Sequence, residues 1–249
     1  MNTHPISLAE TEQHSLAKSI AYHLLPGIIP FLCVLFFAPF LIRSGLTIGL
    51  ALNLVLFLSI VPVQLGILLY TAKKQTGRFT LQGILPYRQK LPMRQYFIWV
   101  PALLVWFILV FFLLEPVGNY LLEYVFNFFP AWFNPAADML SRYSSGMLLA
   151  SWASDLILLG IFVPIVEELY FRGYLLPRLS RYQGASVFIN TVLFAVYHFF
   201  SPWMAVTRII AIFPMCFIVW RTKNIYLGMA VHVLLNLISS LSQYNLYMG

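Results

Sequence analysis

Long apolar runs recur through this sequence, and they constrain its fold more than any other feature. Each run is close to the roughly 20 residues that a helix needs to cross about 30 Å of hydrocarbon. With 61% hydrophobic and 9% charged residues, the chain lies outside the composition of soluble domains. The predicted fold class is all-α, a polytopic transmembrane bundle of about seven to eight helices. The expected spans are residues 24–42, 46–72, 96–114, 147–176, 185–200, 204–220 and 226–242.

The sequence contains no internal repeat or linker, so it predicts a single integral membrane domain over residues 1–249. Residues 1–23 form a leader in which Ser7 and Glu10 predict a helix from about residue 8. Residues 24–114 are the expected scaffold helices, and residues 147–242 carry the polar motifs.

Residues 117–133 are rich in aromatic side chains but are interrupted by Asn127 and Pro130. This pattern is typical of a helix at the membrane interface or of a short re-entrant piece. The alternative is an eighth span.

Three connecting loops carry the basic residues. The loop 73–94 holds six Lys or Arg side chains and no acid, and the other two loops hold Arg178 with Arg181 and Arg221 with Lys223. The positive-inside rule places all three loops, and the N-terminus, in the cytoplasm. Because these residues are scattered between apolar spans, we expect no nucleic-acid partner. The partners that remain are the lipid bilayer and molecules within it.

The stretch IFVPIVEELYFRGYL, residues 161–175, places two adjacent carboxylates inside an apolar span. Ionisable residues at such positions are expensive and are candidates for function. Glu168 and Arg172 are four residues apart and share a helix face, so they are expected to pair. Glu167 points elsewhere, and its low-dielectric surroundings suit a general base. The structural alternative is one buried ion-pair network at the helix end.

Two further polar pairs lie in the following spans. In TVLFAVYHFF, Phe194 and His198 share one helical face, which Asn190 continues one turn earlier. In MAVHVLLNL, His232 and Asn236 are also four residues apart. Each pair alone has a plain alternative, an interfacial histidine or polar residues that join helices by hydrogen bonds. Together with Glu167 they hold nearly every reactive polar group of the last four spans.

Asp155 and Arg208 are the remaining charged residues within the predicted spans. Each lies a few helical turns from the outer membrane surface, opposite the basic loops, and the two are on neighbouring spans. We expect them to form a charge-neutralising pair. The alternative gives Arg208 the task of holding a substrate carboxylate, which a guanidinium matches bidentately.

The ordered motifs Glu-Glu-x-x-x-Arg, Phe-x-x-x-His and His-x-x-x-Asn, each within an apolar helix, resemble the CAAX protease and bacteriocin-processing family of intramembrane proteases. This family, also called Abi, includes the eukaryotic type II CAAX prenyl endopeptidase. The resemblance covers roughly residues 147–242. It implies that Glu167 and His198 activate the attacking water, that His232 and Asn236 complete the site, and that Glu168 and Arg172 support it.

The resemblance leaves the cofactor open, because the family is described both as a zinc metalloprotease and as a glutamate-dependent protease without a tightly held metal. Glu167, His198 and His232 would make an adequate zinc set with a water in the fourth position. If Glu167 is a zinc ligand, it cannot also act as the base. Glu168 would then have to be the base, and the nearby charge of Arg172 lowers the basicity of Glu168. The metal-free alternative keeps Glu167 as the base and uses His232 with Asn236 as oxyanion donors.

The resemblance implies a peptide or protein substrate in the membrane. The chain has no His-Glu-x-x-His, no Gly-x-Ser-x-Gly in a span and no Gly-Asp membrane motif, which argues against other protease classes. Its compact loops favour a bacterial cytoplasmic membrane. Two alternatives remain at this stage, a non-catalytic scaffold or bacteriocin immunity protein and a small proton-coupled carrier. The sequence gives no indication of the oligomeric state.

Overall fold

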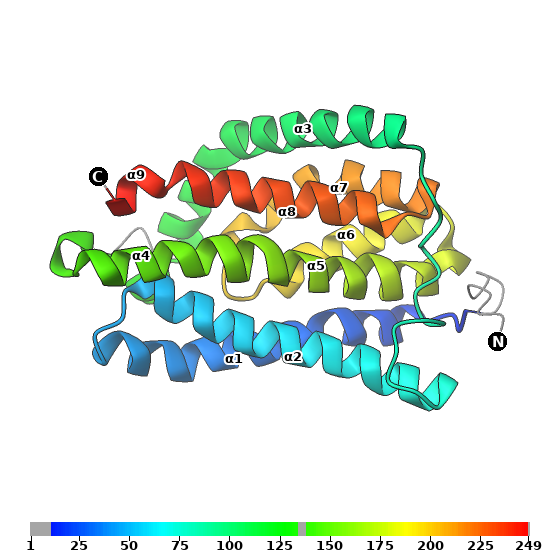
Figure 1. Cartoon of the computed structure of the whole chain (residues 1–249), viewed down its shortest axis with the longest axis horizontal. Helices are drawn as coiled ribbons and strands as arrows, with labels where there is room; N and C mark the ends of the chain where they lie inside the picture. The colour runs from blue at the N-terminus through cyan, green and yellow to red at the C-terminus, as the bar shows by residue number, and fades with distance from the viewer. Residues whose placement is uncertain (1–10, 134–137, 249) are drawn as a thin grey trace.

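The computed structural model describes residues 11–133 and 138–248. Helices account for its regular structure, and the described residues form no β-strand beyond one isolated bridge between Arg88 and Asn224. The helices run roughly side by side in one bundle (Figure 1). The all-α class is therefore confirmed. The helix predicted from about residue 8 begins outside the described residues.

The elements follow one another in a simple order along the chain. The α-helices are α1 (Leu16–Arg43), α2 (Ile48–Thr76), α3 (Met93–Tyr120), α4 (Ser145–Ser154), α5 (Val163–Glu167), α6 (Ala185–Tyr197), α7 (Ala205–Thr222), α8 (Ile225–Ser242) and α9 (Tyr244–Met248). The π-helical segment Asp155–Phe162 joins α4 to α5, and a second one, Glu168–Leu175, continues α5, so that together they form one continuous helical rod. The rod extends through a 3-10 turn to Tyr182 and is 38 residues long.

Polar caps define where several helices begin. Ser15, Thr47, Ser144 and Asn224 each precede a helix and accept a hydrogen bond from a backbone N–H of its first turn. Such caps satisfy donors that have no partner within the helix. Helix α1 therefore starts at Leu16, eight residues before the predicted span, and takes in the last part of the expected leader.

Six helical stretches among the described residues are long and apolar enough to cross a membrane. They are Leu16–Arg43, Ile48–Thr76, Met93–Val125, Ser145–Tyr182, Pro202–Thr222 and Ile225–Ser242. The remaining predicted span, at 185–200, corresponds to the shorter helix α6, which ends at Tyr197. The aromatic segment 117–133 is not an eighth span, because the helical stretch that begins with α3 ends at Val125 and the chain then turns.

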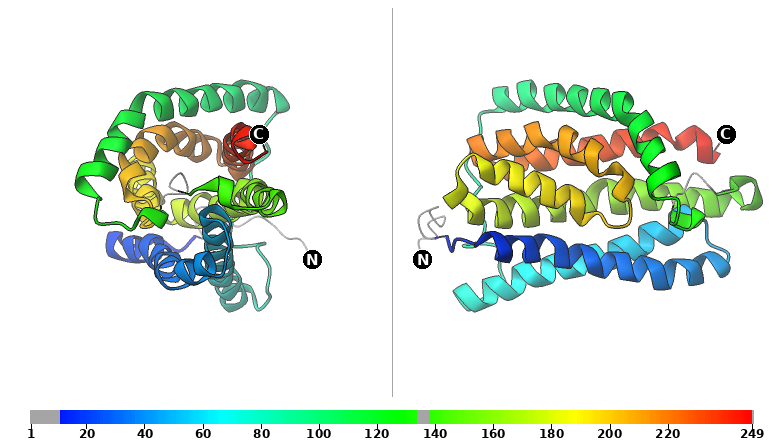
Figure 2. Two further views of the ribbon diagram at one scale, coloured as in Figure 1. Left: turned by 90° about the vertical axis from the view of Figure 1, so that its left-hand side faces the viewer. Right: turned by 180° about the vertical axis from the view of Figure 1, so that it is seen from behind.

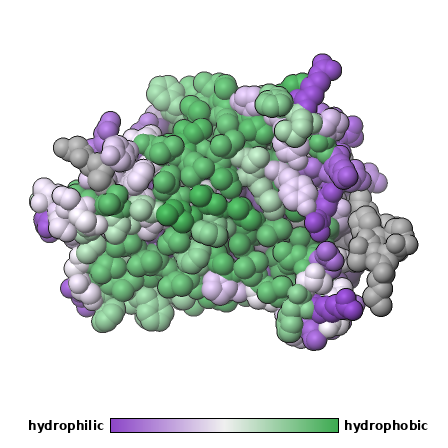
Figure 3. Space-filling view, in the orientation of Figure 1, coloured by the Kyte–Doolittle hydropathy of each residue, from purple (hydrophilic) through white to green (hydrophobic). Residues whose placement is uncertain are grey.

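The surface carries a broad apolar belt between two polar ends (Figure 3). Large apolar side chains such as Phe36, Phe97 and Phe112 are more than 70% exposed. In water such a surface would be an aggregation hazard, whereas in a bilayer it is the expected lipid contact.

The three basic loops meet at one end of the bundle. The amide of Gln89 donates to the carbonyl oxygen of Lys223, and the guanidinium of Arg178 donates to that of Ile84. The N-terminal segment joins them, because the amide of His14 donates to the carbonyl of Arg178. Helix α9 lies at the opposite end (Figure 1). This arrangement agrees with an odd number of crossings.

The connection between α6 and α7 lies inside the bundle. Helix α6 has 13 residues, and the turn that follows it sits well within the length of the molecule (Figure 2). Irregular backbone at membrane depth is tolerated only where protein buries it or where it lines a wet cavity. The fold therefore marks residues 198–204 as the wall of a polar site.

We expect the segment before α1 to loosen in acid. His14 is 1% exposed, and burial followed by the nearby charges of Lys18 and Arg178 lowers the pKa of its imidazole from 6.5 to about 4. The folded state then binds fewer protons than the unfolded state between these values, so its stability is full above pH 6.5 and falls as the pH drops toward 4.

Hydrogen exchange of residues 11–15 measures this effect. Protection factors corrected for intrinsic exchange should fall by up to about tenfold per pH unit in this window. His14→Phe, which packs a ring but does not titrate, should remove the dependence. A dependence that persists in this variant would contradict the assignment to His14.

Candidate active site

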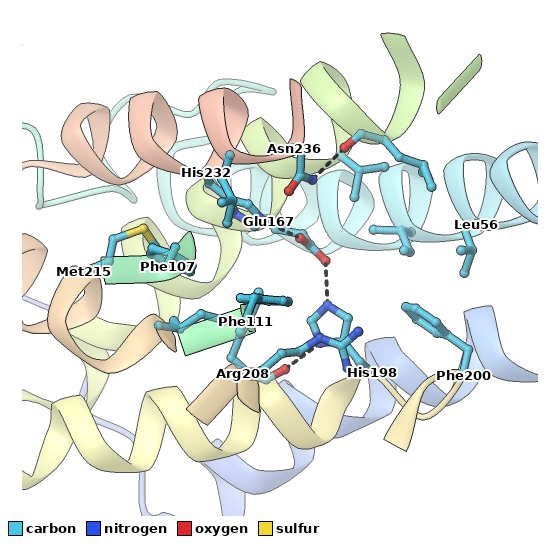
Figure 4. A pocket seen from close by; sticks show the side chains of 16 residues that line it. Leu56, Phe107, Phe111, Glu167, His198, Phe200, Arg208, Met215, His232 and Asn236 are labelled. Carbon is cyan, nitrogen blue, oxygen red and sulfur yellow. Dashed lines mark hydrogen bonds and ion pairs between the residues drawn. The ribbon is translucent and has the colours of Figure 1, made fainter. Parts of the chain in front are cut away.

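A cavity of about 280 Å³ lies inside the bundle where the rod, the α6–α7 turn and α8 meet. Its polar lining comprises Glu167, His198, Arg208, His232 and Asn236. Glu167 extends between His198 and Arg208 on one side and His232 and Asn236 on the other (Figure 4). The volume far exceeds the roughly 30 Å³ that one water molecule occupies in the liquid. The cavity therefore has room for water and for part of a substrate.

Glu167 is 3% exposed, and its carboxylate is oriented by a tyrosine. The hydroxyl of Tyr197 donates to Oε1 of Glu167 at 3.0 Å and accepts from the side-chain amide of Gln64 at 3.1 Å. The Nε2 atom of His198 lies 3.9 Å from Oε1, and that of His232 lies 3.9 Å from Oε2. The structure thus brings together the glutamate and both histidines named from the sequence.

Glu168 and Arg172 form the i,i+4 ion pair that their spacing predicts, with 3.1 Å between NH1 and Oε1 and both side chains 0% exposed. The guanidinium of Arg172 also lies 4.0 Å from the ring centre of Phe194, which adds a cation–π contact. Oε1 of Glu168 reaches Nδ1 of His232 at 3.0 Å. The pair therefore balances one carboxylate and at the same time orients a histidine of the cavity.

The hydrogen-bond partners define the tautomers of the two histidines. Nδ1 of His198 lies 2.8 Å from the carbonyl oxygen of Phe194, and Nδ1 of His232 faces the carboxylate of Glu168. Both partners only accept, so we assign a proton to each Nδ1. In the neutral ring each Nε2 then presents a lone pair to Glu167 and the cavity.

Asn236 is held by a carbonyl group that the helix itself leaves without a donor. The amide of Val163 donates to the carbonyl of Leu158 in the π-helical register, and the next residue, Pro164, has no N–H. The free carbonyl of Leu159 accepts from Nδ2 of Asn236 at 2.9 Å. One amide hydrogen of Asn236 remains for the cavity.

Tyr197 and Gln64 are functional candidates that the motif analysis missed. Gln64 is 0% exposed in the middle of α2, far from the motifs in sequence. Its position as a polar residue within an apolar span is the signal that could have singled it out. Tyr197 offered a weaker signal, because tyrosines are common at membrane interfaces.

One predicted contact is wrong. Asp155 and Arg208 do not pair, because the carboxylate of Asp155 accepts from the hydroxyl of Ser240 while Arg208 donates to the carbonyl and hydroxyl oxygens of Ser201. Asn190, one turn before Phe194 on α6, is not part of the cavity lining and donates to His23 and to the backbone of Phe171.

Glu167, His198 and His232 are residue types that bind metal ions, but the distances between them do not fit one ion. Each histidine has its Nδ1 fixed by an acceptor, as in many zinc sites. Zinc ligands at about 2.1 Å from the ion lie about 3.4 Å apart in a tetrahedron, which is closer than the 3.9 Å of both Glu167–histidine contacts. Among residues 11–133 and 138–248, no three His, Cys, Asp or Glu side chains are placed to hold a metal ion.

A second, larger groove of about 860 Å³ lies between α1 and α2. Tyr170 and Tyr174 of the π-helical segment contribute to its lining, and its charged residues are Glu12, Lys18 and Lys74. Glu12 and Lys18 form an ion pair with each other. The groove lacks the histidines and the buried carboxylate of the first cavity.

The fold and the cavity together define an integral membrane protein with a buried Glu-His-His-Asn site inside an all-α bundle. Residues 147–238 match the model of a protein family described as type II CAAX prenyl endopeptidase Rce1-like. This segment includes every residue of the three motifs, and the match confirms the resemblance found from them. At the family level it supports an intramembrane endopeptidase of the CAAX type. No curated protein and no solved structure matches the chain.

Gly228→Ala should disable the site through Glu168. A Cβ atom at residue 228 would lie 2.7 Å from Oε2 of Glu168 and 3.1 Å from Val219, so the carboxylate must move and release His232. We expect peptide hydrolysis to fall at least about tenfold, as for the loss of a charge-assisted hydrogen bond. Gly66→Ala in α2 is the matched control, because its new Cβ meets nothing within 4 Å. Equal rates for the two variants would contradict this packing.

Tyr197→Phe should lower the hydrolysis rate about 10- to 100-fold, because a hydrogen bond to a carboxylate contributes about 1.5–3 kcal/mol. The ring is conserved, so the thermal unfolding temperature should change little. Tyr120→Phe, at an exposed position on α3, is the control. Initial rates on a common peptide measure the effect, and an unchanged rate would remove Tyr197 from the site.

Proposed function

We propose that this protein is an intramembrane endopeptidase that hydrolyses a peptide bond of a membrane-associated peptide or protein, with Glu167 as the general base. The observation that carries the proposal is the position of the Glu167 carboxylate. It is buried, accepts from Tyr197, and lies 3.9 Å from the Nε2 atoms of two histidines in a cavity. A carboxylate placed in this way inside a membrane protein is a candidate for chemistry.

The attacking water binds between Glu167 and His198. Nε2 of His198 presents a lone pair to this position, so it can accept one hydrogen bond from the water while Glu167 accepts the other. As the water oxygen forms its bond to the carbonyl carbon, Glu167 takes its proton. Tyr197 holds Oε1 in place during the transfer.

The oxyanion that develops on the carbonyl oxygen needs donors on the opposite side of Glu167. Asn236 supplies the amide hydrogen that Leu159 does not use. His232 donates from Nε2 in the form that carries a proton on each ring nitrogen, while the carboxylate of Glu168 accepts from Nδ1. One such donor contributes about 2.7–4 kcal/mol in comparable sites.

Collapse of the tetrahedral intermediate completes the reaction. Glu167 returns its proton to the leaving nitrogen, the C–N bond breaks, and the products are a carboxylic acid and an amine. The same carboxylate thus serves as base and then as acid, and the protein returns to its starting state.

The walls of the cavity indicate where the substrate comes from. Between the polar residues the lining is apolar and aromatic and includes Leu56, Phe107, Phe111, Phe200 and Ile212. Such walls favour an apolar peptide segment that reaches the site from the bilayer. The proposed location is a cellular membrane with the basic end of the bundle in the cytoplasm.

Replacing Glu167 with glutamine tests the proposal directly. Peptides should be compared, by mass spectrometry, in cells that produce the wild type, Glu167→Gln or Glu115→Gln. Glutamine is nearly isosteric and leaves the Glu168–Arg172 pair intact, while Glu115 is an exposed acid on α3. We expect specific peptides to depend on the wild type and on Glu115→Gln and to be absent with Glu167→Gln, a loss of at least about 1,000-fold in rate.

Identical peptide profiles for all three proteins would contradict the proposal. If a biological phenotype persisted in Glu167→Gln as well, the result would favour a non-catalytic scaffold or an immunity protein.

The metal-free form of the mechanism predicts resistance to chelation. Purified protein should retain its hydrolysis rate after treatment with phenanthroline and EDTA, and elemental analysis should find less than one zinc ion per chain. Loss of activity that stoichiometric zinc restores would instead assign Glu167, His198 and His232 as ligands. A histidine variant that lost bound zinc together with activity would make that assignment specific.

A further inference from the structure

Arg208 presents a guanidinium to the active-site cavity without a carboxylate beside it. The side chain starts from the first turn of α7 and lines the same cavity as Glu167. Its hydrogen bonds are to Ser201, at 2.9 Å to the carbonyl oxygen and 2.7 Å to the hydroxyl oxygen. In the part of the chain that the structure describes, no acid forms an ion pair with it.

Such a position is expensive for an arginine. A cation within a membrane bundle costs several kcal/mol unless it is paired or hydrated, so an arginine without an ion-pair partner is a candidate for function. The two arginines that are buried among the described residues are compensated in place: Arg172 pairs with Glu168, and Arg178 donates to two backbone carbonyls and stacks on Tyr174. Ser201 uses two of the five guanidinium donors of Arg208, which fixes its orientation and leaves the others available.

We infer that Arg208 binds a carboxylate of the substrate and so determines which peptides the site accepts. This inference rests on the proposed function. A guanidinium matches a carboxylate through two parallel N–H···O bonds, which a lysine cannot form. Two sources supply this chemistry, the α-carboxylate of a peptide that ends in the cavity and the side chain of an Asp or Glu near the scissile bond.

The geometry relates the bound carboxylate to the scissile bond. Arg208 and His198 lie on the same side of Glu167, and His232 and Asn236 lie on the other (Figure 4). A carboxylate on Arg208 therefore places the chain across Glu167, with its carbonyl group toward Asn236. Because both groups share a cavity of about 280 Å³, the carboxylate and the scissile bond must be close in sequence.

A different role for Arg208 would be to balance the charge of Glu167 across the cavity. That role does not depend on the substrate, so its loss would weaken the reaction of every peptide equally. Binding of a substrate carboxylate instead predicts a loss confined to peptides that carry one. The difference between peptides separates the two roles.

Three sets of short apolar peptides provide the probe. The first set has a free C-terminal carboxylate and no Asp or Glu, the second has the same sequences as C-terminal amides, and the third consists of amides with one Asp or Glu. Hydrolysis is measured by mass spectrometry with the wild type in lipid nanodiscs. Binding of fluorescent versions is measured in the Glu167→Gln protein, which retains Arg208 but lacks the base.

The neutral amides should be bound and cleaved about 10- to 100-fold less well than one of the carboxylate sets, as expected for a charge-assisted pair. In Arg208→Gln this preference should fall to about one, whereas Arg221→Gln should keep it, because Arg221 is exposed at the far end of α7. The set that shows the preference identifies the source. If Arg208→Gln does not fold, Arg208→Lys retains the charge without the planar fork and should show an intermediate preference.

Equal binding and cleavage of all three sets by the wild type would overturn the inference. A uniform loss across the sets in Arg208→Gln would also overturn it in favour of charge balance. The binding measurement separates this inference from the proposed function: a carboxylate preference that depends on Arg208, without any hydrolysis by the wild type, supports the assignment of Arg208 and refutes the protease.

Discussion

The buried ion pair between Glu168 and Arg172 is the interaction on which the polar interior depends. Taking both charges out of water is costly, and their mutual attraction together with the Phe194 ring and His232 offsets that cost. Because Arg172 balances the charge of Glu168, this carboxylate can orient His232 while it stays outside the cavity lining. Glu167, the residue before it in the helix, is left to face the Nε2 atoms of His198 and His232.

Irregular helix geometry places the other polar residues of the site around Glu167. The π-helical register before Pro164 leaves the carbonyl of Leu159 for Asn236, and the early end of α6 places His198 within the bundle. In a regular α-helix the amide of Val163 would donate to the carbonyl of Leu159, which would then not be free for Asn236. Departures of this kind often occur at functional sites, and here each one positions a side chain that the proposed reaction uses.

Much of the fold follows from the sequence, because apolar length and basic loops respond to the bilayer alone. The i,i+4 spacing of Glu168 and Arg172 likewise predicts their contact, since it depends on one helix. Contacts between helices were harder to predict. The opposite charges of Asp155 and Arg208 predict that they pair. In the structure each of them instead forms a hydrogen bond with a serine. Tyr197 and Gln64 act on Glu167 through tertiary packing, which no spacing within a single helix reveals.

The most direct test of the central claim is an experimental structure of the Glu167→Gln protein with a bound substrate peptide. The account predicts a peptide carbonyl oxygen within about 3.5 Å of the Asn236 side-chain amide, with its carbon beside the substituted side chain and between His198 and His232. A peptide bound only in the groove between α1 and α2, with the cavity around residue 167 holding no part of it, would contradict the account.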